Sequence, residues 1–328
     1  MAASAVSADP TPQSKGNASG SRGDEIAHLV TFVFACTVVL AIAILVWKLW
    51  ADSALTREKF GFHFLSGTNW DPNAKDYGAL PFIWGTVITS LLALLISVPL
   101  GVGAAIFLAE LAPARLSNAC TFLVELLAAV PSVIYGLLAI FTLVPLMDEY
   151  IQPFFKHTVG QVPGLAVFFS GPSTGNSYLT AGMVLAIMTL PFIISISRES
   201  LLEVPRDQRE AALALGATKW ESTIQVVVPH ARLNILGSIF LGLARALGET
   251  MAVTMVIGND TNIHASLIAP GSTIAALIAS QFHEASDPLQ RSALIELGLV
   301  LFLITVIINA LARLLIIATR GKGTAHSA

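Results

Sequence analysis

Six apolar segments, each long enough to cross a bilayer, constrain this chain more than any other feature. A helix needs about 20 apolar residues to cross the hydrocarbon core. The chain is 55% hydrophobic and only 12% charged, whereas a soluble domain carries about 25% charged residues. We therefore predict an all-α, polytopic membrane protein with six membrane-spanning helices. Their predicted ranges are about 27–49, 81–110, 120–146, 178–198, 233–258 and 293–317.

Three of the predicted spans contain an internal proline: Pro99, Pro131 and Pro191. A proline removes one helical hydrogen bond and kinks the helix. In a membrane, such a break is tolerated where a neighbouring helix or a cavity satisfies the freed carbonyls. Ser132 and Tyr135 follow Pro131 closely. Their hydroxyls either line a cavity on the substrate path or only repair the freed backbone hydrogen bonds.

The distribution of Lys and Arg predicts that both termini are cytoplasmic. Six spans place the two termini on one side of the membrane, and the side with more positive charge is the cytoplasm. The terminal side would hold Lys15, Arg22, Arg115, Arg198, Arg206, Arg209, Lys219, Arg232, Arg313, Arg320 and Lys322. The opposite side would hold Lys48, Arg57, Lys59, Lys75, Lys156 and Arg291.

The chain divides into a membrane domain and two tails. Residues 1–25 are rich in Ala, Ser, Gly and Pro and lack the apolar core of a signal peptide, so we predict a disordered cytoplasmic tail. Residues 26–320 form the membrane domain, and 321–328 form a second cytoplasmic tail. The outer loops, about 50–80 and 147–177, are predicted to be irregular. The second, 147–177, is either an interfacial loop with aromatic anchors or a docking platform for something outside the membrane.

The cytoplasmic segment between the fourth and fifth spans carries the strongest local signals. Pro205 favours the start of a helix and Gly216 favours its end. Thr218 and Glu221 fit a capping box for a second helix, which Pro229 is expected to end. The segment therefore predicts two short helices on the cytoplasmic side.

This segment, residues 204–230, resembles the EAA loop of permease subunits of bacterial ABC importers, whose pattern is EAA-x3-G-x9-I-x-L-P. The matching residues are Glu210, Ala211, Ala212, Gly216 and Pro229, with Val226 and Val228 in place of Ile and Leu. The resemblance implies a type I importer (MetI-like) permease fold over about 80–317. It also implies that these residues, with Leu213, couple the permease to an ATP-hydrolysing subunit.

The chain contains no GxxxxGK[ST] phosphate-binding loop. A separate ATPase is therefore expected to use ATP and Mg, with no cofactor bound by this chain. We do not expect an enzyme, because no nucleophile–base set and no metal-ligand cluster is present. Cys36 and Cys120 lie in apolar runs and are interpreted as small buried residues.

Three further stretches resemble the PstC-type permease subunit of bacterial phosphate ABC importers. They are "PLGVGAAIFLAELAP" (99–113), "AAVPSVIYGL" (128–137) and "LARALGETMAVTMVIGN" (243–259). The resemblance covers about three quarters of the chain. It implies a pore-forming permease for inorganic phosphate in the bacterial inner membrane.

The same resemblance implies partners: a PstA-type second permease, two PstB-type ATPase copies and a PstS-type external phosphate-binding protein. No nucleic acid is expected. Three alternatives stay open, namely the PstA-type sister subunit, a permease for another oxyanion and, from a different class, a passive anion channel.

Arg245 and Glu249 are charged residues in the fifth predicted span, where each costs about 2.5–3.5 kcal/mol on insertion scales. Their four-residue spacing predicts that both project from one face of a helix. A guanidinium suits a tetrahedral oxyanion because it is permanently charged and offers several donors. We predict an ion pair that is closed at rest and opens as phosphate passes. A purely structural ion pair is the alternative.

Three other carboxylates lie in or near the predicted spans. Glu110 and Glu125 are expected to reach the interface or to pair with Arg115. Glu296 is expected to be solvated at the outer start of the sixth span.

Overall fold

The computed structural model describes residues 22–162, 164, 166–171 and 174–320, so both predicted terminal tails lie largely or wholly outside the described residues. The chain separates into two compact units, residues 1–48 and 49–328. The described part of the first unit is one helix, α1 (Arg22–Asp52), which continues into the second unit. Its apolar side chains are exposed, and Cys36 is exposed with them, contrary to the predicted burial.

Six helical segments of the described chain are long and apolar enough to cross a membrane, as predicted. They are Glu25–Asp52, Leu80–Leu111, Ser132–Gln161, Tyr178–Leu202, Lys219–Leu247 and Pro288–Leu314. The fold is mostly helical rather than entirely so, because one two-stranded antiparallel hairpin is present. In this hairpin, β1 (Trp70–Asp71) pairs with β2 (Asp76–Tyr77), Trp70 opposite Tyr77.

The third predicted span, 120–146, is wrong in its position. Helix α5 (Ala114–Ala129) ends before Pro131, and Val130 is extended, with φ −68° and ψ 129°. A residue before proline is pushed out of the helical region, which explains the break. A new helical run follows: α6 (Ser132–Leu138), the π-helical turn η2 (Ala139–Leu143), α7 (Val144–Leu146), the π-helical turn η3 (Met147–Ile151) and α8 (Gln152–His157). The loop that was predicted over 147–177 therefore begins about ten residues later than expected.

Helices α4 (Leu80–Ile106) and α9 (Tyr178–Leu202) form the centre of the second unit. Both contain their predicted internal prolines. Glycines let them approach closely. A Cβ on Gly101 would lie 2.8 Å from Ile193 Cγ2, and one on Gly182 would lie 2.7 Å from Leu92 Cβ. The two helices therefore pack as one unit along their length.

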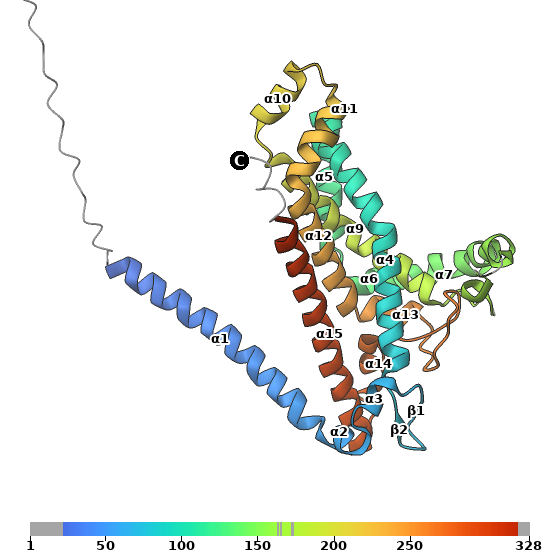
Figure 1. Cartoon of the computed structure of the whole chain (residues 1–328). Helices are drawn as coiled ribbons and strands as arrows, with labels where there is room; N and C mark the ends of the chain where they lie inside the picture. Colours follow the sequence, from blue (N-terminus) through green and yellow to red (C-terminus); the bar gives the residue numbers. More distant parts are fainter. Residues whose placement is uncertain (1–21, 163, 165, 172–173, 321–328) are drawn as a thin grey trace, which may run out of the picture. The chain divides into compact units, whose positions relative to one another are not determined.

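The two ends of the second unit differ in character (Figure 1). At one end, α2 (Ala54–Phe60), α3 (His63–Ser66) and the hairpin pack an aromatic cluster against α14 (Ile274–Gln281) and α15 (Pro288–Arg320). This loop was predicted to be irregular, but its buried Phe64, Trp70 and Tyr77 give it a core. At the other end, α10 (Arg206–Ala214) and α11 (Lys219–Ser222) project beyond the long helices.

The loop around residues 158–177 contains two short 3-10 turns, η4 (Val159–Gln161) and η5 (Ala166–Phe169). Phe155 of α8 stacks on Phe169 with the ring centroids 5.3 Å apart. Residues 163, 165, 172 and 173 of this loop lie outside the described residues.

Candidate functional site

Residues 204–230, the predicted coupling segment, form the first short helix as predicted, α10, and then the start of a second helix, α11. Pro205 is the residue just before α10, and Gly216 follows it in the left-handed region with φ +93°. Thr218 Oγ1 accepts from the Glu221 N–H at 3.3 Å, and Glu221 Oε2 accepts from the Thr218 N–H at 2.8 Å. This confirms the capping box.

Pro229 does not end the second helix, contrary to the prediction. The helix continues from α11 through a π-helical turn, η6 (Thr223–Val227), into α12 (Val228–Gly248), with Pro229 in the first turn of α12. A proline N cannot donate, and its ring clashes with the carbonyl four residues earlier. A wider π turn placed just before it shifts the hydrogen-bond register, so the chain passes the proline without a break.

The predicted coupling residues lie mostly on the exposed surface of this segment. Of the predicted coupling residues, Glu210, Ala211, Leu213, Gly216 and Pro229 are exposed and Ala212 is half-buried. Large apolar side chains join them, since Leu213 is 47%, Leu215 90% and Trp220 55% exposed. An exposed apolar patch on a segment that projects beyond the long helices favours a protein partner.

Glu110 pairs with Arg209 rather than with Arg115. Arg209 Nη2 lies 2.8 Å from Glu110 Oε1, and the two side chains are mostly buried. Arg115 is exposed at the start of α5. The sequence prediction chose the nearer arginine, but the fold brings α10 to the end of α4.

The fifth predicted span breaks where its charges lie. Helix α12 ends at Gly248, and Glu249 is extended with ψ 126°. A new helix, α13 (Met251–Val256), follows. The predicted common helix face for Arg245 and Glu249 is therefore wrong. The Glu249 carboxylate accepts from the Ala252 N–H at 3.4 Å, so the side chain caps the new helix instead of continuing the old one.

Arg245 has no carboxylate partner among the residues that the structure describes. It is exposed in the last turn of α12, and its guanidinium carbon lies 4.3 Å from the centroid of the Phe192 ring on α9. The closed Arg245–Glu249 pair that we predicted is not formed. The cation instead rests on an aromatic face, which stabilises charge without neutralising it.

The Tyr135 hydroxyl bonds to a backbone carbonyl at the helix break between α5 and α6. In an uninterrupted helix, the Leu127 carbonyl would accept from residue 131, but Pro131 has no N–H. Tyr135 Oη donates to this carbonyl at 2.8 Å. This carbonyl also accepts from the Val130 N–H at 3.2 Å, so Tyr135 adds a second bond to it, and a role of Tyr135 in the path stays a prediction. Ser132 is the half-buried first residue of α6.

The two helix breaks lie close together. Gly136 of α6 packs directly on α13, because a Cβ there would lie 2.9 Å from Ala252 Cα and 2.8 Å from Met255 Sδ. Arg245 and Tyr135 are near enough to interact electrostatically. Arg245, Glu249 and Tyr135 therefore belong to one region, where two broken helices meet beside α9.

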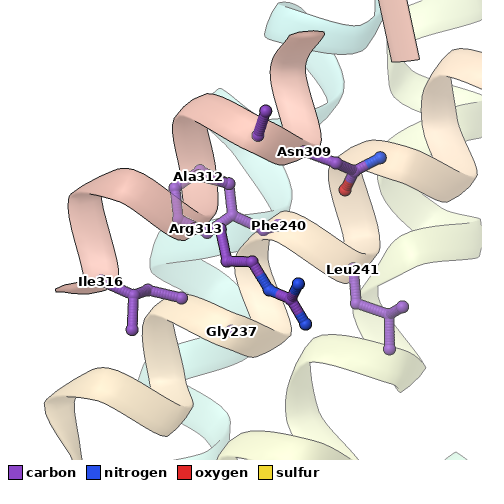
Figure 2. A pocket seen from close by; sticks show the side chains of 8 residues that line it. Gly237, Phe240, Leu241, Asn309, Ala312, Arg313 and Ile316 are labelled. Atoms are coloured by element: carbon purple, nitrogen blue, oxygen red, sulfur yellow. The ribbon is translucent and has the colours of Figure 1, made fainter. Parts of the chain in front are cut away.

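A groove that the sequence did not suggest lies between α12 and α15 (Figure 2). It has a volume of about 660 Å³, and its α12 wall is formed by Gly237, Phe240 and Leu241. Arg313 extends from α15 toward α12, with Asn309 one turn away. Leu241 and Gly237 lie four and eight residues before Arg245, so they follow its side of α12. Only the packing of α15 on α12 could reveal this groove.

Glu296 is buried, at 8% exposure, rather than solvated, and its Oε2 lies 3.9 Å from Arg57 Nη1. Glu125 is exposed on α5. No group of three or more His, Cys, Asp or Glu side chains that could hold a metal ion occurs in the described ranges.

Comparison with known proteins identifies the family. Residues 97–320 match the model of the binding-protein-dependent transport system inner membrane component. The phosphate transport system permease protein PstC of Haemophilus influenzae is 48% identical over 89% of this chain and 93% of its own length. PstC of Mesorhizobium japonicum is 47% identical over 88% of this chain and 89% of its own length.

Solved structures support the fold. A chain of the MetNI methionine ABC transporter in an inward-facing conformation has a TM-score of 0.53 and 16% identity. The match covers 72% of this chain and 94% of the MetNI chain. A chain of a bacterial ABC transporter that imports alginate has a TM-score of 0.58 and 16% identity, covering 89% and 98%. The chain therefore belongs to the binding-protein-dependent transport system inner membrane components and, within them, to the PstC family of phosphate transport system permease proteins.

Proposed function

We propose that this chain, the permease subunit of a phosphate ABC transport system, carries phosphate through the inner membrane past Arg245. Family membership makes it a multi-pass transport subunit and not an enzyme. The observation that supports the role of Arg245 is its exposure in a membrane-spanning helix without a carboxylate partner among the described residues. A cation at such a position is costly unless it has a use.

Arg245 would act by replacing part of the hydration shell of the anion. Its donors fit the oxygens of hydrogen phosphate, and the Phe192 ring supports the guanidinium without competing for those donors. Glu249 lies at the adjoining helix break and would act as a negative group that limits how tightly the anion is held. Ser132 and Tyr135 are weaker candidates for the same path, since Tyr135 already serves the Leu127 carbonyl.

The path would continue from Arg245 along α12 to the groove at Arg313. Gly237 lies about 12 Å from Arg245 along the helix axis, at 1.5 Å per residue. None of the described residues that line this groove is a carboxylate. The adjoining groove contains Glu199 and Glu203, and their negative charge would confine an anion to the side of Arg313.

The assembly follows from the family. An ABC permease implies an ATPase and a binding protein as partners, and we assign these as two PstB-type ATPase copies, which use ATP and Mg, and a PstS-type phosphate-binding protein. A PstA-type permease would complete the pore. The exposed surface at Glu210, Ala211, Ala212, Leu213 and Gly216 would receive the ATPase. We therefore propose that 204–230 and both termini, with the tails 1–25 and 321–328, lie in the cytoplasm.

The test is Arg245→Gln in the complete complex, reconstituted with the binding protein and assayed for ATP-driven phosphate uptake. We expect uptake to fall about tenfold or more, because a hydrogen bond to a charged group contributes about 1.5–3 kcal/mol. Near-normal uptake would exclude Arg245 from the path. Loss of assembly would favour a structural role for Arg245.

Two further measurements separate the alternatives. Accumulation of sulfate or molybdate, with no accumulation of phosphate, would assign the complex to another oxyanion. Removal of the ATPase should abolish accumulation in a pump, whereas a passive channel would still equilibrate phosphate.

A further inference from the structure

One buried arginine holds the first coupling helix against the membrane-spanning helices. Arg209 of α10 places Nη2 2.8 Å and Nε 3.2 Å from Glu110 Oε1. It also donates from Nη2 to the Leu201 carbonyl at 2.6 Å and from Nη1 to the Val204 carbonyl. The exposed fractions are 18% for the Arg209 side chain and 8% for that of Glu110. Since no residue of α10 is fully buried, this side chain is the polar anchor of the helix.

The anchor joins three elements. Glu110 belongs to η1 (Phe107–Leu111), the π-helical turn that ends α4. The Leu201 carbonyl lies in the last turn of α9, where it also accepts from the Val204 N–H at 3.4 Å, and the Val204 carbonyl lies just beyond the helix. Arg209 thus caps α9 and binds α4 with a single guanidinium. It also fixes the short turn between α9 and α10, which would otherwise be free to bend.

The predicted coupling segment, residues 204–230, is joined to the membrane-spanning helices in a different way at its other end. There α11, η6 and α12 form one continuous helix, and α12 carries Arg245. The partner of Arg245 in the cation–π contact, Phe192, lies on α9. A displacement of the coupling segment therefore reaches both sides of this contact. It reaches α12 through the backbone, and it reaches the α4–α9 pair through Arg209.

We propose that Arg209 is a positioning residue that makes α10 move with α4 and α9, so that ATPase-driven motion displaces α9 relative to α12 at the Phe192–Arg245 contact. This inference rests on the proposed role of the chain as an ATP-driven permease, and it does not depend on the identity of the solute. A buried ion pair that only stabilises the fold is the competing explanation.

The experiment uses the complete complex in proteoliposomes with the binding protein, and it measures solute uptake and ATP hydrolysis on the same samples. The variants are Arg209→Gln, Glu110→Gln and both together. Arg115→Gln is the matched control, because this exposed arginine begins α5, near Glu110 in sequence, and Glu110 does not pair with it. Arg209→Lys keeps the charge but cannot reach Glu110 and two carbonyls at once.

We expect Arg209→Gln and Glu110→Gln to hydrolyse ATP in the assembled complex while uptake per ATP falls about fivefold or more, the usual lower range of coupling between sites. The double variant should be no worse than Arg209→Gln, and Arg209→Lys should be intermediate. Arg115→Gln should keep the wild-type ratio.

An unchanged ratio of uptake to ATP hydrolysis in Glu110→Gln would overturn the proposal, as would a parallel loss of both activities in proportion to the assembled complex. Glu110 is decisive because its side chain is mostly buried and lies outside α10, so its substitution changes no residue of the first coupling helix. If the Arg209 variants fail to assemble, the Glu110→Gln complex still tests the proposed role of Arg209. Failure of the wild-type complex to accumulate phosphate would count against the proposed substrate alone, and the ratio would then be measured with the solute that is accumulated.

Discussion

The guanidinium carbon of Arg245 lies 4.3 Å from the centroid of the Phe192 ring, so α12 and α9 meet at a cation–π contact beside two helix breaks. Such a contact is worth about 0.5–2 kcal/mol. It fixes the direction of the cation while leaving its donors available. The contact also places an aromatic residue, which sequence analysis did not select, in the candidate path.

Phe192→Leu is expected to lower the maximal rate of phosphate uptake by about two- to thirtyfold, since the cation loses about 0.5–2 kcal/mol of support and its position is no longer fixed. Uptake by the reconstituted complex measures this. Phe192→Tyr, which keeps a ring face, is the control and should remain close to the wild type. Equal rates for the Leu and wild-type proteins would remove the contact from the mechanism.

Local chemistry explains what could be predicted from the sequence. Gly216 and the Thr218–Glu221 capping box depend on residues within a few positions of one another, and the structure confirms both. The number of spans follows from length and hydropathy in the same way, although the positions of the third and fifth do not. These features need no knowledge of which helices are neighbours.

The features that were missed depend on tertiary packing or on a choice between local alternatives. Glu110 pairs with an arginine 99 positions away, which no spacing rule can identify. Glu249 satisfied the spacing of a helical ion pair, but it caps α13 instead, because a carboxylate can bond to the backbone as well as to a cation. Pro229 was read as a helix end, whereas a π turn carries the helix past it.

Gly136→Ala is expected to destabilise the protein by about 1–3 kcal/mol, the usual cost of overpacking. The added Cβ would lie 2.8 Å from Met255 Sδ and 2.9 Å from Ala252 Cα, and the backbone atom cannot move aside easily. Thermal unfolding of the purified protein in detergent measures the change. Gly103→Ala is the matched control, because that helical glycine has nothing within 4 Å of the added Cβ. The control should be neutral or stabilising by up to about 1 kcal/mol, and an equal loss in both variants would contradict close packing of α6 on α13.

Tyr135→Phe tests whether this residue repairs the backbone or acts in the path. Loss of its hydrogen bond to the Leu127 carbonyl should destabilise the protein by about 1 kcal/mol. We expect the phosphate concentration for half-maximal uptake to stay unchanged. A shift in that concentration, with wild-type thermal stability, would instead assign the hydroxyl to phosphate.

Arg313→Gln tests the groove between α12 and α15. If phosphate leaves Arg245 along α12, the loss of this cation should lower the uptake rate about tenfold, as expected for a lost charge-assisted hydrogen bond. Arg313→Lys should recover much of the rate, since a lysine keeps the charge at the groove. Arg115→Gln, which removes an exposed arginine outside the groove, controls for net charge.

Protection of an introduced thiol distinguishes a path role of the groove from a structural one. Asn309→Cys, in a background with Cys36 and Cys120 replaced by Ser, places a thiol on the wall of the groove. Phosphate supplied to the turning-over complex should slow its reaction with a negatively charged thiol reagent, whereas sulfate should not. If the labelling rate is independent of phosphate, and Arg313→Gln transports normally in zwitterionic lipid, the groove is not part of the path. If the defect of Arg313→Gln appears only in membranes that contain anionic lipid, the groove binds a lipid headgroup instead.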